Sequence, residues 1–346
     1  MQFRWRRGAL GIAALALVCQ AQPALSAESA TSVYLLGSKG TLAGMTPPPG
    51  LYISDANYYY SGDASGTAAK GVTLRRTGTT VSVSADVSVE GAAYYNIPTA
   101  LWVAPGEFLG GNAGFSVMMP IGWKDISAQV DATASLTLPP PLSITLSRGR
   151  SLAISDDNAD FGDPLLSTFV GWHHGNLHSN LALMANIPVG QWDTGRLANI
   201  GFNHWAFDVT GALTWLDPST GFELSGAAGL TFNTENPDTD YKSGTDFHLE
   251  FAAVQHFSKQ LAVGVAGYHY DQITGDSGAG AVLGDFEGRV TGIGPQLNYD
   301  FAVGQLPVFT SVKWIHELEA TNRLEGDMGF LTVTVPLGPP PAPPAE

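Results

Sequence analysis

Residues 245–272 read TDFHLEFAAVQHFSKQLAVGVAGYHYDQ. In the first half of this stretch, apolar side chains recur at every second residue from Phe247 to Phe257, except at Gln255, and Asp246, His248, Glu250 and His256 fall on the other parity. Because successive side chains of a β-strand point to opposite faces, the alternation predicts a strand with one apolar and one polar face. A break at 258–260 and a second alternating run from Leu261 predict a tight antiparallel hairpin. The hairpin alone leaves open whether its apolar face contacts another sheet or lipid.

Aromatic residues repeat at a fixed spacing in three successive predicted strands. In each strand two aromatic residues of one parity lie ten residues apart, and no charge lies on that face between them. Ten residues of tilted strand rise roughly 23 Å along the membrane normal, close to the ~25 Å apolar band between aromatic girdles. A soluble sandwich explains the alternation but not this spacing. We therefore predict that the apolar face contacts lipid and that six residues form the girdles: Trp205, Trp215, Phe222, Phe232, Phe247 and Phe257.

The N-terminus has the composition of an export signal. Three arginines precede an apolar run at 8–18, and small residues near Ala24 and Ala27 offer a cleavage site. The run is too short to span a membrane as a helix, so residues 1–27 are predicted to be a signal peptide. Cys19, the one cysteine, lies inside this segment. We therefore expect an exported mature chain that does not rely on disulfides.

The overall composition favours a membrane barrel. The 346 residues carry a net charge of −15, which is unsuitable for nucleic acid binding. Only 14% of residues are charged, against roughly 25% in soluble domains, and glycine is frequent at 41 residues. An exported chain with alternating segments and no helical periodicity indicates an all-β, antiparallel up-and-down barrel in the outer membrane of a Gram-negative bacterium. Lipid and lipopolysaccharide are its expected surroundings, and we expect a monomer.

Fourteen strand candidates fall within residues 51–337, and twelve remain if two of the less regular ones between 95 and 160 are loop. In the second half of the chain, short connections alternate with long ones, as periplasmic turns and extracellular loops do in outer-membrane barrels. The last strand then leaves the C-terminus in the periplasm, and an even strand count puts the mature N-terminus there too. The candidates are 51–60, 71–77, 80–100, 111–121, 125–137, 164–174, 176–188, 200–215, 221–232, 245–257, 260–273, 285–301, 305–319 and 327–337.

Two segments flank the predicted barrel. Residues 338–346 are proline-rich and are predicted to form an extended periplasmic tail. Residues 28–50 are too rich in glycine and proline for a strand. A barrel of about fourteen strands is too wide for its own side chains to fill, so water or a plug must occupy it. Residues 28–50 are either that plug or a periplasmic leader, and the plug candidates are Gly37, Gly44, Pro47, Pro48, Pro49 and Gly50.

The polar parity of the strands is predicted to face the lumen, because ionisable groups facing lipid would cost a few kcal/mol each. Tyr268, Tyr270 and Phe309 could form an apolar shelf for a ligand. Lys313 and Glu317 lie four residues apart on one face, where they either form a salt-bridge ladder along the wall or contact a ligand. The candidates for the lumen and substrate path are His248, Glu250, Tyr268, Tyr270, Phe309, Lys313, Glu317 and Arg323.

Several motifs from about Gly162 onward resemble the family of outer-membrane barrels named for the MetA-pathway of phenol degradation. The segment 43–50 resembles the start of that family. The chain departs from the usual pattern in its proline tail, since barrels often end on an aromatic residue that the barrel-assembly machinery reads. The motifs are Gly162-Asp163-Pro164, Trp172-x-x-Gly175-Asn176, Pro188-x-Gly190, Gly201-x-Asn203-x-Trp205, Asn236-Pro237-Asp-Thr239-Asp-Tyr241-Lys-Ser243-Gly244, Gly267-Tyr268-x-Tyr270-x-Gln272, Gly275-Asp276-Ser277-Gly278, Asn322-Arg323-x-x-Gly326 and Val335-Pro336-Leu337.

The resemblance implies a transporter for hydrophobic compounds, often linked to aromatic catabolism and similar to long-chain fatty-acid transporter barrels. We therefore expect passive uptake of small hydrophobic molecules, with aromatic compounds among the candidate substrates, and no enzyme activity, cofactor or metal. Two alternatives stay open: a water-filled porin for polar solutes, and a structural or receptor barrel that acts through its acidic outer loops.

Overall fold

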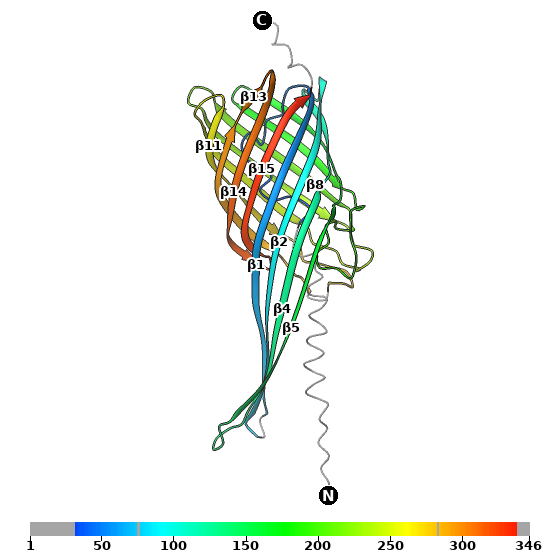
Figure 1. Cartoon of the computed structure of the whole chain (residues 1–346), viewed down its shortest axis with the longest axis vertical. Coiled ribbons are helices and arrows are strands. Elements are labelled where there is room, and N and C mark those ends of the chain that lie inside the picture. The colour runs from blue at the N-terminus through cyan, green and yellow to red at the C-terminus, as the bar shows by residue number, and fades with distance from the viewer. Residues whose placement is uncertain (1–31, 75–76, 282–283, 338–346) are drawn as a thin grey trace.

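An antiparallel β-barrel forms the body of the protein (Figure 1). The computed structural model describes residues 32–74, 77–281 and 284–337, so the predicted signal peptide and the proline tail lie outside the described residues. Within these ranges no helix is long and apolar enough to span a membrane. The strands are β1 (Gly50–Leu74), β2 (Thr79–Phe108), β3 (Gly111–Met118), β4 (Ile121–Thr137), β5 (Thr145–Phe161), β6 (Leu165–His174), β7 (Leu177–Asn186), β8 (Ala206–Asp217), β9 (Phe222–Asn233), β10 (Asp246–His256), β11 (Leu261–Gln272), β12 (Arg289–Tyr299), β13 (Phe301–Val303), β14 (Leu306–Thr321) and β15 (Glu325–Leu337).

Twelve of these strands close into a ring. Their order is β1-β15-β14-β12-β11-β10-β9-β8-β7-β6-β3-β2, and β2 pairs with β1 to complete the wall. The short strand β13 pairs only with β14, whereas β4 and β5 lie beside β2 outside the ring. In the described part of the chain, the predicted transmembrane barrel is therefore confirmed at the alternative count of twelve strands.

The count differs from fourteen because several strands are longer than the sequence pattern suggested. Candidates 51–60 and 71–77 both overlap one strand, β1, which ends at Leu74. Candidates 111–121 and 125–137 correspond to β3 and β4, which pair with successive parts of the same long neighbour, β2. Residues 145–161, which contain no predicted strand, form β5 against β4. β1 lies on one side of β2, and β3 and β4 lie on the other, so each pair of candidates counts once and fourteen becomes twelve.

A four-stranded sheet projects from one end of the barrel (Figure 1). The pairing of β1 with β15 ends at Asp63, which lies opposite Glu325, but β1 and β2 stay paired as far as Leu74 and Thr79. Strands β4 and β5 extend the same sheet. We call the described residues of 64–92 and 125–157 the extension.

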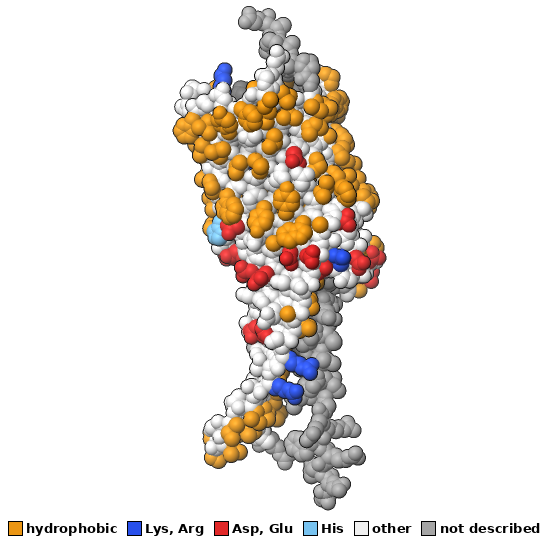
Figure 2. Space-filling view, viewed as in Figure 1, with side chains coloured by type: hydrophobic (Ala, Val, Ile, Leu, Met, Phe, Trp, Pro, Cys, Tyr) orange, Lys and Arg blue, Asp and Glu red, His pale blue; other side chains and the backbone are white. Residues whose placement is uncertain are grey.

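The two faces of the barrel wall differ in polarity as predicted for a membrane barrel. In β8, buried and exposed residues alternate strictly: Asp208 and Thr210 are buried, whereas Phe207 and Val209 are exposed. Figure 2 shows the outer surface covered by apolar side chains, with acidic side chains gathered in a row at the base of the extension. In β8 the inward side chains are therefore mostly polar and the outward ones mostly apolar.

The connections divide between the two ends of the barrel. Residues 218–221, 257–260 and 304–305 make short turns at one end, which we call the short-turn end. Residues 187–205, 234–245 and 273–288 make longer connections at the other end, the long-loop end, where the extension also begins (Figure 1).

The chain that precedes β1 does not stay at the short-turn end. β1 starts there, as an even strand count requires, but Ser32 lies at the long-loop end beside Tyr270 and Asn322. Residues 32–49 thus run through the barrel before β1 begins. The even strand count alone predicted that the mature N-terminus lies at the periplasmic end. Ser32, the first described residue, lies at the opposite end of the barrel.

Candidate functional site: the barrel lumen

Residues 32–49, which we call the N-terminal segment, lie in the lumen and bind one side of the wall. Their backbone groups contact side chains from β7, β8, β9, β10, β12 and β14. An irregular backbone inside a barrel has no strand neighbours, so each of its polar groups needs a side-chain or water partner. The inward ionisable groups of the wall supply many of these partners.

Lys313 and Glu250 hold the middle of the segment. The Lys313 ammonium donates to three successive carbonyl oxygens, those of Gly37, Ser38 and Lys39, the last two at 3.0 and 2.8 Å. Glu250 accepts a hydrogen bond from the backbone nitrogen of Lys39 at 2.7 Å. Both side chains are almost completely buried. One cation and one anion from the wall thus satisfy the donors and acceptors of a single turn of the segment.

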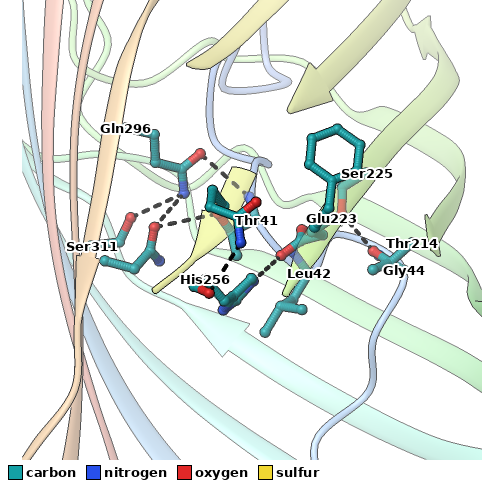
Figure 3. A network of polar contacts seen from close by, with 12 residues as sticks. Thr41, Leu42, Gly44, Thr214, Glu223, Ser225, His256, Gln296 and Ser311 are labelled. Atoms are coloured by element: carbon teal, nitrogen blue, oxygen red, sulfur yellow. Dashed lines mark hydrogen bonds and ion pairs between the residues drawn. The ribbon is translucent and has the colours of Figure 1, made fainter. Parts of the chain in front are cut away.

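A second polar network binds the following residues (Figure 3). Glu223 accepts a hydrogen bond from the backbone nitrogen of Leu42 at 2.6 Å, and its other oxygen lies 2.6 Å from Nε2 of His256. The Thr214 hydroxyl accepts a bond from the nitrogen of Gly44 at 2.9 Å. Gln296 accepts a bond from the nitrogen of Thr41. The wall therefore fixes the segment at successive backbone positions rather than at one anchor.

His248 lies at the long-loop end of this array. Its Nε2 atom is 2.8 Å from a carboxylate oxygen of Asp208, which also accepts a bond from Thr231. The ring of Tyr34, in the N-terminal segment, stacks on the His248 ring with centroids 3.5 Å apart. His248 is completely buried. The structure thus places this residue under the segment, not on an open substrate path.

The other inward candidates form the floor on which the segment packs. Tyr268 and Tyr270 belong to a buried apolar cluster that includes Leu36 of the segment. Tyr270 donates to Asp246 at 2.7 Å, and the guanidinium of Arg323 lies 4.2 Å from the centre of its ring. Desolvation alone would lower the pKa of Arg323, but the surrounding phenol and carboxylate oxygens raise it, so this side chain stays charged.

Lys313 and Glu317 do not act as one ladder. Lys313 binds the N-terminal segment, whereas Glu317 accepts hydrogen bonds from the hydroxyls of Tyr60 and Tyr268 and from the backbone nitrogen of Gly326. Glu317 also lines the cavity described below, so ligand contact stays a prediction for this residue. Both residues serve contacts between parts of the chain that are far apart in sequence.

Phe309 is separate from the aromatic cluster. It lies opposite Thr334 near the short-turn end and is 43% exposed. Its parity matches that of Lys313, but the two residues lie at different heights of the barrel. The structure therefore brings Tyr268 and Tyr270 together and leaves Phe309 out.

The remaining candidates fall into two groups. The girdle aromatics Trp205, Trp215, Phe222, Phe232 and Phe257 are exposed on the outer face, and Phe247 is partly exposed on the same parity; their girdle role stays a prediction. Among the plug candidates, Gly37 lies where a Cβ atom would be 3.1 Å from the side chains of Ile315, Met328 and Phe330, and Gly44 lies against β8. Pro47 lines a cavity, the oxygen of Pro48 accepts a bond from Tyr52, Pro49 is half-buried and Gly50 starts β1.

The N-terminal segment leaves a cavity of about 630 Å³ on the side of the lumen away from Lys313 and Glu250. The segment forms one side of this cavity, and β1, β2, β3, β6 and β7 form the other. Most of the large side chains around it are apolar or aromatic: Leu35, Leu36, Met45, Tyr58, Tyr60, Tyr95, Ile97, Leu101, Met118, Phe169, Met184 and Phe202. The sequence reasoning did not select these residues. Tyr58 and Tyr60 of β1 could have been found from their shared parity, but the strands opposite them lie in the least regular part of the pattern.

Gly44 is a position where a small change tests the contact between segment and wall. A Cβ atom at Gly44 would lie 2.6 Å from the backbone oxygen of His178 and the backbone nitrogen of Thr214, neither of which can move without distorting a strand. We expect Gly44→Ala to lower the free energy of unfolding by about 1–3 kcal/mol, as overpacking commonly does. Hydrogen–deuterium exchange should show lost protection at Leu42 and Gly44.

Gly211→Ala in β8 is the matched control, because a Cβ atom there meets nothing within 4 Å. It should leave both the stability and the exchange of the segment unchanged. Equal protection in Gly44→Ala and Gly211→Ala would contradict the close approach of the segment to β8.

Comparison with known proteins places the fold among outer-membrane barrels. The COG4313 outer membrane channel from Pseudomonas putida F1 superposes with a TM-score of 0.57 at 12% sequence identity, over 84% of this chain and 97% of the channel. A FadL homologue from Pseudomonas aeruginosa gives a TM-score of 0.34 at 9% identity, over 83% and 90% of the two chains. No curated protein matches the sequence. The family described as MetA-pathway of phenol degradation matches residues 73–333, which is most of the chain. The chain therefore belongs to this family.

Proposed function

We propose that this protein is a monomeric outer-membrane channel for the passive uptake of small hydrophobic molecules. The observation that carries the proposal is the cavity of about 630 Å³ between the N-terminal segment and the β1–β3 side of the wall. Its volume lies in the range of roughly 300–1,000 Å³ that is common for sites of small molecules. The barrel spans the membrane with the long loops outside, surrounded by lipid and lipopolysaccharide after folding by the barrel-assembly machinery.

The lining of the cavity favours an apolar over a polar substrate. Tyr58, Tyr95 and Phe169 offer aromatic surface, while Ile97 and Met118 offer aliphatic surface. Such a surface gains from removing an apolar molecule from water, at roughly 25 cal/mol per Å². Lys313, Glu250 and Glu223 hold the N-terminal segment. Other charged groups, among them Glu317 and Arg323, also border the cavity, but most of its large side chains are apolar or aromatic. We therefore infer a largely apolar path, with aromatic compounds as the preferred cargo and the segment as the gate.

The family description supports transport linked to aromatic catabolism, and the barrel resembles a protein described as an outer membrane channel. A general porin for polar solutes is the competing function. It requires an open aqueous lumen, whereas here the N-terminal segment occupies one side and apolar side chains border the other. A receptor that acts through its outer loops would not require the cavity at all. We assign the protein no catalytic role and no cofactor.

Uptake of N-phenylnaphthylamine by intact cells tests the proposal. This neutral apolar dye fluoresces once it passes the outer membrane, and cells that produce the protein should take it up faster than cells that lack it. Ile97→Asn should slow uptake roughly fivefold, because an amide in the apolar lining costs about 1 kcal/mol without a partner. Ile97→Val keeps the lining apolar and should retain the rate. Faster entry of a polar antibiotic with unchanged dye uptake would instead support the porin.

A further inference from the structure

The extension has one apolar and one polar face. Residues directly opposite each other in antiparallel strands point to the same side of a sheet. The row Val72–Val81–Leu136–Leu146 crosses all four strands on one face. The neighbouring row Thr73–Thr80–Thr137–Thr145 lies on the other face, where Thr73 bonds to Thr80 and Thr137 to Thr145. The extension is therefore an amphipathic sheet that stands in water.

Cations gather on the apolar face of this sheet. The register places Lys70, Val83, Ala134 and Arg148 in one row and Arg150 in the next row on the same face. Residues 64–85 and 132–155 contain no aspartate or glutamate, although the chain as a whole carries 31 acidic and 16 basic residues. Figure 2 shows basic side chains between the apolar tip and the acidic row at the base of the extension. An acidic protein thus presents a cationic, apolar tip.

The tip exposes large apolar side chains at its end. Leu142 is 64% exposed, Leu146 is 61% exposed and Val72 is 57% exposed. Along the strand, Arg148 and Arg150 follow Leu146 by roughly 7 and 13 Å. An interfacial element buries its apolar side chains about 5–10 Å into the boundary between headgroups and acyl chains. A tip inserted to that depth would place the two arginines at the level of the lipid phosphates.

We propose that the tip of the extension docks on a lipid surface that carries anionic headgroups. The apolar residues enter the surface, and Lys70, Arg148 and Arg150 bind its phosphates. The surface belongs to a body outside the cell's own membrane, because the strands carry the tip roughly 36 Å beyond Asp63, where the wall pairing ends. A soluble polyanion would match the cations, but it would offer nothing for the exposed leucines.

Co-sedimentation with vesicles tests the proposal. The full chain is placed in nanodiscs of phosphatidylcholine, and its binding to vesicles that contain phosphatidylglycerol is compared with binding to vesicles of phosphatidylcholine alone. We expect clear preference for the anionic vesicles. Arg148→Ser with Arg150→Ser should weaken that binding about thirtyfold, from about 1 kcal/mol for each cation near an anionic surface. Leu142→Ser with Leu146→Ser should weaken it at least roughly tenfold, from the lost apolar burial.

Matched variants separate docking from misfolding. Arg148→Lys with Arg150→Lys keeps both charges and should bind within roughly threefold of the original protein, because the attraction depends mainly on charge. Lys259→Ser removes one cation from the short-turn end and should have no effect. Heat-dependent gel mobility shows that each barrel is folded. Equal binding to both kinds of vesicle would overturn the proposal, as would full binding by the variant Arg148→Ser with Arg150→Ser. So would equally tight binding of dextran sulfate that is insensitive to the leucine substitutions, because that result identifies a soluble polyanion as partner.

Discussion

Deletion of residues 33–46 should raise the single-channel conductance of the barrel about tenfold or more. The deleted residues occupy one side of the lumen and carry the backbone groups that bind Lys313, Glu250 and Glu223. Without them, these wall residues face water, and wide barrels with polar interiors conduct ions through an aqueous channel. Recordings in planar lipid bilayers measure the change. Residues 47–49 stay in place, so that β1 begins as before.

A deletion of residues 70–83 is the control for this experiment. It shortens the extension but leaves the lumen intact, so the conductance should match that of the full chain. If removal of residues 33–46 leaves the conductance equally unchanged, the N-terminal segment is not the element that closes the lumen, and its role as a gate must be abandoned.

Lys313→Met should lower the free energy of unfolding by about 3–5 kcal/mol. The ammonium of Lys313 binds three carbonyl oxygens of the N-terminal segment and lies on the same side of the lumen as the buried carboxylate of Glu250. Removing one member of a buried set of charges leaves the other uncompensated, and such losses have this magnitude. Urea unfolding in lipid vesicles, followed by tryptophan fluorescence, gives the value.

The double variant Lys313→Met with Glu250→Gln shows whether the loss comes from the stranded carboxylate. Glutamine keeps an acceptor for the Lys39 nitrogen but carries no charge, so the double variant should recover part of the lost stability. Lys259→Met at the exposed short turn is the matched control and should change stability by less than ~0.5 kcal/mol. If Lys313→Met and Lys259→Met lower the free energy of unfolding by similar amounts, Lys313 does not hold the segment.

The half of the barrel from β8 to β15 could be predicted because buried and exposed residues alternate along most of β8, β9 and β10 and along parts of the later strands. The hairpin at 245–272 is β10 and β11, with the turn at the predicted place. Its apolar side chains lie on the outer face of the barrel. His248 and Glu250 point inward, because ionisable side chains that face lipid cost free energy. Where one face of each strand contacts lipid and the other contacts polar groups, the sequence pattern alone determines orientation.

The extension could not be predicted because no membrane surrounds it. Its strands alternate between small apolar residues and serine or threonine, a pattern that fits any exposed sheet as well as a barrel wall. The prolines at 139–141 lie in the connection between β4 and β5 at the tip. Nothing in a local pattern shows that β2 continues through 30 residues and pairs with two strands in succession.

The contacts in the lumen depend on residues that are distant in sequence. Inward parity identified Lys313 as a lumen residue, but its partners at Ser38 and Lys39 lie 275 and 274 residues away. The path of the N-terminal segment determines which inward side chains bind the segment and which line the cavity. For this reason the sequence selected Tyr268 and Tyr270, which lie under the segment, and passed over Tyr58 and Tyr95, which line the cavity.

The position of the N-terminal segment also constrains the order of assembly. Residues 32–49 are made before every strand, yet their partners on β9, β10 and β14 are made among the last. The wall closes where β1 meets β15, and these two strands are separated by almost the whole described chain. Bringing such distant segments together is slow because the intervening chain loses entropy before the contacts form. The simplest order is one in which the segment joins the open sheet of late strands first and the β1–β15 seam closes around it, so that the last step of folding encloses a segment made before any strand.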